Sequence, residues 1–174
     1  MKFSHSLSFF LLCTLILSCS KSEESILSNN DLVGTWKLID FRCDDGKTVT
    51  NFLGQTITST YTSTGKDYAA ESTFTENPNT YHSKGSYTSV VTTTTIGTSQ
   101  TSEVSTGLFD WTGTWKKEGN ILTTTLKDQP TEKAEIITLN ATTFEYKVSI
   151  NKVENNGISE STITATYFFK LIKK

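Results

Sequence analysis

The sequence predicts an all-β domain built from antiparallel strands. Threonine accounts for roughly a fifth of the residues and, together with Ser, Tyr, Phe, Ile and Val, it suits a half-buried pleated surface better than a helix. Beyond residue 18, no apolar pattern with the helical period is long enough to predict a helix. Short runs of alternating side chains are instead separated by turn residues at frequent intervals.

The first strong strand is expected over Gly34 to Arg42, where an Asp44-Asp45-Gly46 turn would end it. Further strands are expected at Gln55 to Ser63, Tyr68 to Phe74, Tyr81 to Ser89, Gly107 to Lys117, Ile121 to Lys127, Glu135 to Leu139, Thr143 to Val153 and Ile158 to Leu171. Turns at residues 118–120, 140–141 and 155–157 predict hairpins, because Asn and Gly tolerate positive φ. About eight to ten strands with short turns suit an up-and-down barrel or a sandwich, and the barrel leaves no unpaired edge.

The segment from Thr88 to Thr106 does not fit a barrel wall, because it is rich in Thr and Ser and poor in apolar side chains. It predicts a hairpin extending past the barrel rim or a mobile loop. A polar wall of the barrel lumen is the alternative.

The N-terminus has the layout of a secretory signal peptide: Lys2 precedes an apolar stretch from Phe9 to Leu17, which is too short to span a membrane. Ile16-Leu17-Ser18-Cys19 resembles the lipobox of bacterial lipoproteins, which implies cleavage before Cys19 and lipidation of Cys19. We therefore expect a signal peptide over 1–18, a lipidated N-terminus and tether over 19–30, and a folded domain over 31–174. An ordinary cleaved signal and an uncleaved anchor are the alternatives.

The acidic stretch after Cys19, residues 20–24, resembles the surface-export signal of lipoproteins from the Bacteroidetes. The resemblance implies a lipid-anchored protein of the outer membrane, displayed on the cell surface. The periplasmic face of that membrane is the alternative.

Charge and composition argue against several functions. The formal net charge of −2 becomes −3 once Lys2 is removed, and without a clustered basic face we expect no nucleic-acid partner. Once Cys13 is cleaved off and Cys19 lipidated, Cys43 has no disulfide partner. A single remaining histidine, His82, gives neither a catalytic triad nor a metal site, so we expect no enzyme activity, no cofactor and no metal.

The segment Asp31 to Leu38 resembles the opening of a lipocalin-like domain, with Gly34 and Trp36 at the positions of the Gly-x-Trp motif. The resemblance implies a barrel whose closed end is covered by Trp36 under a short helical turn, here expected within Ile26 to Leu32. The arginine that covers this tryptophan in typical lipocalins has no counterpart, and Lys170 could take its place through its methylenes. The chain therefore resembles lipocalin-like lipoproteins rather than the typical transport subgroup.

Aromatic residues predict a possible ligand site. Trp111 and Trp115 would share one strand face, and together with Tyr146 and Phe169 they could form the aromatic wall of a cavity. Ordinary core packing is the other interpretation of the two tryptophans. The sequence thus predicts a lipid-anchored, lipocalin-like protein that binds a small apolar or amphipathic ligand. The alternative is a surface structural or protein-interaction module without a small-molecule ligand.

Overall fold

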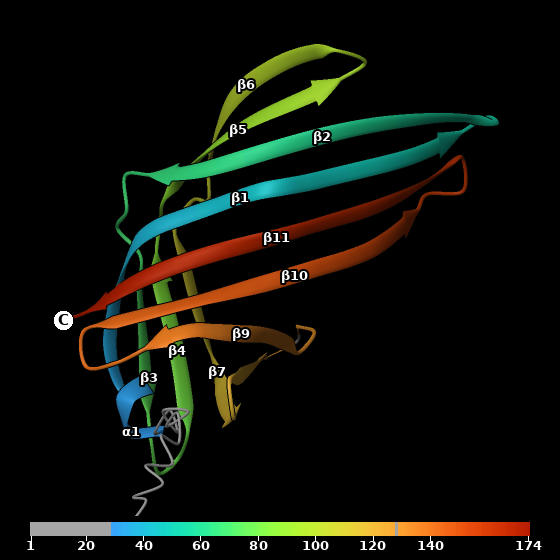
Figure 1. Cartoon of the computed structure of the whole chain (residues 1–174). Coiled ribbons are helices and arrows are strands. Elements are labelled where there is room, and N and C mark those ends of the chain that lie inside the picture. Colours follow the sequence, from blue (N-terminus) through green and yellow to red (C-terminus); the bar gives the residue numbers. More distant parts are fainter. Residues whose placement is uncertain (1–28, 128) are drawn as a thin grey trace, which may run out of the picture.

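The computed structural model describes residues 29–127 and 129–174 (Figure 1). Within them lie a short helix, α1 (Asn29–Leu32), and eleven strands: β1 (Gly34–Phe52), β2 (Gln55–Lys66), β3 (Glu71–Thr75), β4 (Thr80–Gly85), β5 (Thr88–Thr95), β6 (Thr98–Ser105), β7 (Phe109–Glu118), β8 (Ile121–Leu126), β9 (Glu132–Leu139), β10 (Thr143–Asn155) and β11 (Ser159–Lys173). The predicted signal peptide, Cys19 and the tether up to residue 28 lie outside the described residues.

Eight strands close into an antiparallel barrel. Their order around the ring is β1, β3, β4, β7, β8, β9, β10 and β11, and pairing of β11 with β1 completes it. The predicted all-β barrel is therefore confirmed. The described residues form eleven strands where eight to ten were predicted, and three of them, β2, β5 and β6, lie outside the ring.

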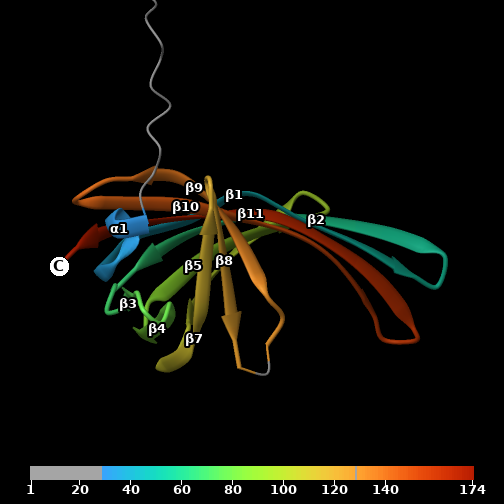
Figure 2. The same cartoon turned by 90° about the horizontal axis from the view of Figure 1, so that it is seen from below.

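The long strands leave the barrel and form a second, open sheet. β1 pairs with β3 only through residues 34–37 and then pairs with β2 through residues 42–52. Its partner β11, together with β10, follows it outward, while β5 and β6 extend the sheet beyond β2 (Figure 1). We call this part the sheet extension: the outer portions of β1, β10 and β11, with β2, β5 and β6. Figure 2 shows its long hairpins projecting to one side of the barrel.

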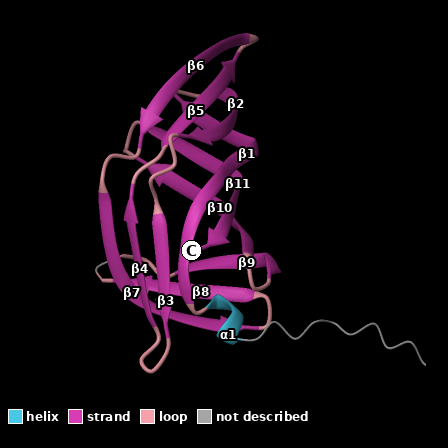
Figure 3. Ribbon diagram, turned by 90° about the vertical axis from the view of Figure 1, so that its left-hand side faces the viewer, coloured by secondary structure: helices cyan, strands magenta, loops and turns pink. Residues whose placement is uncertain are grey.

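α1 lies at one end of the barrel (Figure 3), and the core fills that end, since Leu32 of α1 belongs to it. Trp36 is fully buried there, its indole Nε1 donates to the Leu32 carbonyl oxygen at 2.8 Å, and its ring lies 5.6 Å from that of Phe144. The buried core is built from residues 32–171: Leu32, Trp36, Leu38, Ala70, Phe74, Trp115, Leu122, Ala134, Ile136, Leu139, Phe144 and Leu171. These residues and the closed ring all lie within residues 32–173, so this segment contains its own hydrophobic core.

The lysine that covers Trp36 is Lys173, not Lys170 as expected. The Lys173 ammonium lies 5.0 Å from the centre of the indole, a cation–π contact, whereas Lys170 pairs with Glu145 on the barrel exterior. Gly34 makes room for this contact: it has a φ of +133°, and a Cβ there would lie 2.8 Å from the Lys173 side chain. The Gly-x-Trp motif thus has a structural role at the closed end.

Two sequence predictions need correction. The Asp44-Asp45-Gly46 turn is absent, because β1 continues through it with an irregular register, and the Asp45 carboxylate accepts a hydrogen bond from the Thr166 backbone N–H at 2.8 Å. The strand expected over Tyr81 to Ser89 is two strands, since β4 ends at Gly85. Thr88 to Thr106 forms the β5–β6 hairpin outside the barrel, and the alternative of a lumen wall is wrong.

Candidate functional site

Above the core, the barrel encloses a cavity of about 830 Å³ whose lining reaches the start of β7 and the β8–β9 connection, at the end opposite α1. Its wall takes side chains from every strand of the barrel. Toward the core it is bounded by Leu38, Phe74, Leu122, Phe144 and Leu171. Farther out, the wall combines aromatic rings with Thr, Leu, Val and Pro side chains, and its charged groups, Asp110, Lys127 and Glu132, are exposed. The inner wall is therefore uncharged and largely apolar.

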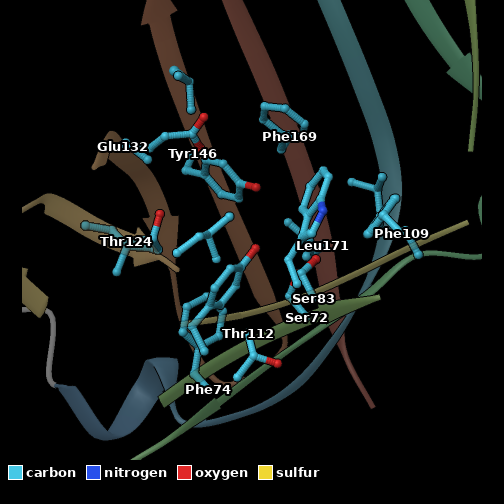
Figure 4. A pocket seen from close by; sticks show the side chains of 18 of the residues that line it. Ser72, Phe74, Ser83, Phe109, Thr112, Thr124, Glu132, Tyr146, Phe169 and Leu171 are labelled. Carbon is cyan, nitrogen blue, oxygen red and sulfur yellow. The ribbon is translucent and has the colours of Figure 1, made fainter. Parts of the chain in front are cut away.

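Two pairs of stacked rings form much of the aromatic wall. Tyr146 on β10 and Phe169 on β11 stack with their centres 4.9 Å apart, and Figure 4 shows them side by side. Phe109 and Trp111 at the start of β7 stack at 4.6 Å. Flat rings on adjacent positions give a broad apolar surface at low conformational cost, which suits contact with an apolar ligand.

Three of the four predicted ligand-binding residues line this cavity. Tyr146 and Phe169 lie in its wall, and Trp111 lies at its rim, half exposed. Trp115 is on the same face of β7 as Trp111, as expected, but it does not line the cavity. Its buried indole donates to the Thr75 carbonyl oxygen at 2.8 Å and meets Phe74 edge to face, so Trp115 belongs to the core.

Three tyrosine hydroxyls give the cavity its polar character: those of Tyr81, Tyr87 and Tyr146. In the part of the chain that the structure describes, none of the three hydroxyls has a hydrogen-bond partner. Burial raises the pKa of Tyr146 well above its ordinary value, and the nearby phenols of Tyr81 and Tyr87 and the Glu132 carboxylate raise it further. Burial also raises the pKa of Tyr87. Tyr87 and Tyr146 thus stay protonated at neutral pH, with O–H groups able to donate to a ligand.

The remaining polar groups of the wall are satisfied or weakly polar. The hydroxyls of Ser72 and Ser83, on the neighbouring strands β3 and β4, hydrogen-bond to each other at 3.0 Å (Figure 4). Thr112 and Thr124 also line the cavity. The Ser72 and Ser83 hydroxyls thus bond to each other, whereas the tyrosine hydroxyls keep donors that a ligand could use.

The sequence analysis missed Tyr81, Tyr87 and Phe109. Strand alternation offers a signal for Phe109, which is two residues before Trp111 and so shares its face. It offers none for the meeting of Tyr81 and Tyr87 with Tyr146, because these residues come from β4, the β4–β5 connection and β10. Only closure of the barrel brings them together.

The remaining reactive side chains lie at the rim of the cavity or outside it. His82 Nε2 lies 2.6 Å from an oxygen of the Asp110 carboxylate, which is one of the exposed charged groups of the cavity wall. Cys43 is buried, its Sγ lies 4.0 Å from Asp45 Oδ1, and burial raises the pKa of the thiol, which makes the thiolate scarce. Residues 29–127 and 129–174 hold no cluster of His, Cys, Asp and Glu that could bind a metal ion. Over the same ranges, no helix has both the length and the apolar character needed to span a bilayer.

An eight-stranded antiparallel barrel, closed by a tryptophan at one end and hollow toward the other, defines a class of small β-barrels with an internal cavity. The family comparison agrees with this class. The model of the lipocalin-like domain family matches residues 32–146, and the chain belongs to that family. No curated protein and no solved structure matches the chain.

Proposed function

We propose that this protein binds one small amphipathic molecule in its barrel and does so without chemical conversion, while a lipid on Cys19 holds it at a bacterial outer membrane. The observation that carries the binding function is the cavity of about 830 Å³, with a largely apolar inner wall and three tyrosine hydroxyls that have no hydrogen-bond partner among the described residues. Membership of the lipocalin-like family supports it, because barrels of this kind suit small ligands. The lipid anchor rests on the lipobox resemblance of residues 16–19.

The wall chemistry selects the ligand class. Aromatic and aliphatic side chains favour an apolar body, and the tyrosine O–H groups favour a head group that accepts hydrogen bonds, such as a carbonyl, ester or carboxylate. A ligand that buries roughly 300 Å² of apolar surface would gain roughly 7 kcal/mol. Because association costs several kcal/mol, this apolar contribution alone supports only weak binding, in about the millimolar range, and each hydrogen bond to a tyrosine strengthens it by about 1 kcal/mol.

Displacement of an uncharged apolar fluorophore, N-phenyl-1-naphthylamine, tests this function. We expect saturable binding that the variant Val148→Trp abolishes, because Val148 lies in the cavity wall and an indole there would project into the space that the ligand needs. The matched control is Val153→Trp, on the opposite face of the same strand β10, which should bind normally. A long-chain fatty acid should displace the fluorophore better than an alkane of equal length, and Tyr146→Phe should narrow that difference. Absence of saturable binding to the wild-type chain would contradict the proposal.

The lipid anchor has a separate test. Cys19→Ser should move the protein from the membrane fraction to the soluble fraction when the full chain is expressed in a bacterium with an outer membrane. Surface display is then read from access of an external protease to whole cells. Membrane retention of Cys19→Ser would favour the uncleaved apolar anchor instead.

The open edge of β6 favours a second candidate function, capture of a protein partner by strand addition. All eight residues of β6 are exposed, and in the described chain β6 pairs on one side only, with β5. Residues 88–105 can be deleted cleanly, since the Thr106 N–H donates to the Tyr87 carbonyl at 3.0 Å and the ends already meet. If this candidate is right, the deletion abolishes partner capture while the barrel and its fluorophore binding remain.

A further inference from the structure

The three hairpin tips of the sheet extension each expose a large aliphatic side chain. Leu53 in the β1–β2 turn is 79% exposed, Ile96 in the β5–β6 turn is 85% exposed, and Ile158 in the β10–β11 turn is 69% exposed. Phe52, beside Leu53, adds a partly exposed ring. Single exposed apolar residues are common on proteins, but one at each of three tips on the same structure needs an explanation.

At two of the tips, the backbone conformation is unfavourable for the aliphatic residue that occupies it. Leu53 has a φ of 47° and Ile96 a φ of 49°, and each precedes a glycine that also has positive φ, Gly54 and Gly97. A two-residue turn with two positive φ angles prefers Asn, Asp or Gly at its first position, and a β-branched residue such as Ile is a conformational outlier there. The β10–β11 turn shows the favourable solution, with Asn155, Asn156 and Gly157 in the turn and Ile158 after it. An aliphatic side chain is thus held at two tips against local preference, which indicates a role for the side chain itself.

Charge is absent from these two hairpins. Residues 48–65 and 85–102 contain no Asp, Glu, Lys or Arg, although 20% of the chain is charged. The third hairpin carries charges, among them the Lys152–Glu154 ion pair on β10. The β1–β2 and β5–β6 tips can therefore enter an apolar interface without desolvating a charged side chain, which would be costly.

The tips are separate but face one way. Figure 1 shows all three hairpins pointing away from the barrel on the same side. Phe52 of β1 pairs with Ser159 of β11, so the β1–β2 and β10–β11 tips end at the same level. Thr95 of β5 pairs with Ser59 of β2, so the β5–β6 tip, which carries Ile96, ends closer to the barrel. The step of about four residues amounts to roughly 13 Å. Three separated points can rest on one tilted plane, while a folded protein partner would need three matching pockets.

We propose that Leu53, Ile96 and Ile158 insert into the interfacial region of a lipid bilayer, so that the sheet extension makes a second membrane contact that is independent of the Cys19 lipid. A fluid apolar layer accepts separate aliphatic side chains wherever they meet it, and burial of their surface drives the contact. The inner face of the extension then lies between the bilayer and the cavity mouth. On that face of β10 and β11, Ile150 and Ala165 continue outward from Val148 of the cavity wall.

Co-sedimentation with phosphatidylcholine vesicles tests this contact on residues 20–174, which contain the whole barrel and lack both the signal segment and the lipidated cysteine. We expect the wild-type domain to bind and the triple variant Leu53→Asn, Ile96→Asn, Ile158→Asn to lose at least about tenfold in affinity. Asn is favoured at positive φ, so the triple variant should melt at the same temperature or higher, which separates lost binding from lost folding. The control is Leu108→Asn, 91% exposed beside β7 and away from the tips, which should bind like wild type.

The outcomes distinguish this contact from the ligand function of the barrel. Val148→Trp, whose indole would obstruct the cavity, should bind vesicles as the wild-type domain does. Failure of the wild-type domain to sediment with vesicles, or equal binding by the triple Asn variant, would overturn the proposal. So would a dimer of the wild-type domain in the absence of lipid that the triple variant converts to a monomer, because the tips would then hold a second copy of the chain.

Discussion

Trp36 gives the sharpest test of the closed end of the barrel. Its side chain is fully buried, rests against Phe144, lies under the Lys173 ammonium and donates a hydrogen bond to the Leu32 carbonyl. Replacing a buried tryptophan by alanine removes its transfer free energy and leaves a cavity, at a cost of about 3–5 kcal/mol. Loss of the indole N–H adds about 1 kcal/mol, because the Leu32 carbonyl loses its partner.

Urea unfolding followed by far-ultraviolet circular dichroism measures this cost without relying on tryptophan fluorescence. With a slope of about 2 kcal/mol/M, a loss of about 4 kcal/mol lowers the midpoint by about 2 M. Trp36→Phe keeps a ring but lacks the N–H, so it should lose less than Trp36→Ala. Trp111→Ala, at the half-exposed rim, is the matched control and should cost much less. A loss below about 1 kcal/mol for Trp36→Ala, the range of surface substitutions, would refute the closed-end reasoning.

Three further predictions concern other parts of the barrel. Gly34→Ala should lower the free energy of unfolding by roughly 1–3 kcal/mol, because φ at residue 34 is +133°, and a urea midpoint equal to that of wild type would contradict this. Since the pKa of Tyr146 is raised by burial, the folded state holds its proton longer than the unfolded state. The stabilisation that Tyr146 gives the folded state is therefore complete below its ordinary pKa of 10.0 and is lost as the pH rises above that value. Between a pH below 10.0 and a pH above it, the urea midpoint should therefore fall less in Tyr146→Phe than in wild type. The buried thiol of Cys43 should react with Ellman's reagent at the rate of unfolding, and fast reaction of the folded protein would contradict its burial.

Much of the barrel could be predicted from the sequence because local signals decide it. Alternation sets the strands, and the Asn140-Ala141 and Asn155-Asn156-Gly157 turns place hairpins where β9, β10 and β11 pair. The Gly-x-Trp motif places Trp36 at the closed end, since Gly34 permits the contact between Lys173 and the indole. These features depend on residues close in the chain or on one short motif.

The missed features depend on contacts between distant segments. The sequence of Asp44-Asp45-Gly46 predicts a turn, but β1 pairs with β11 on one side and β2 on the other, so the strand continues through these residues. The Asp45 carboxylate accepts a hydrogen bond from the Thr166 N–H. Trp115 and Trp111 look equivalent on one face of β7, yet Trp115 lies deeper, where Phe74 and the Thr75 carbonyl enclose it. Depth along the barrel axis is set by the register between strands, which the sequence of one strand does not contain.

The measurement that tests the central claim most directly is native mass spectrometry of residues 20–174 after exposure to a total bacterial lipid extract. A cavity of about 830 Å³ that binds one amphipathic molecule predicts a single discrete mass increase, absent from Val148→Trp and retained by Val153→Trp. The fragmented adduct then identifies the ligand class, which we expect to have an apolar body and a hydrogen-bond-accepting head group. A wild-type domain that keeps its unliganded mass, or an adduct of equal occupancy on Val148→Trp, would contradict ligand binding in the barrel.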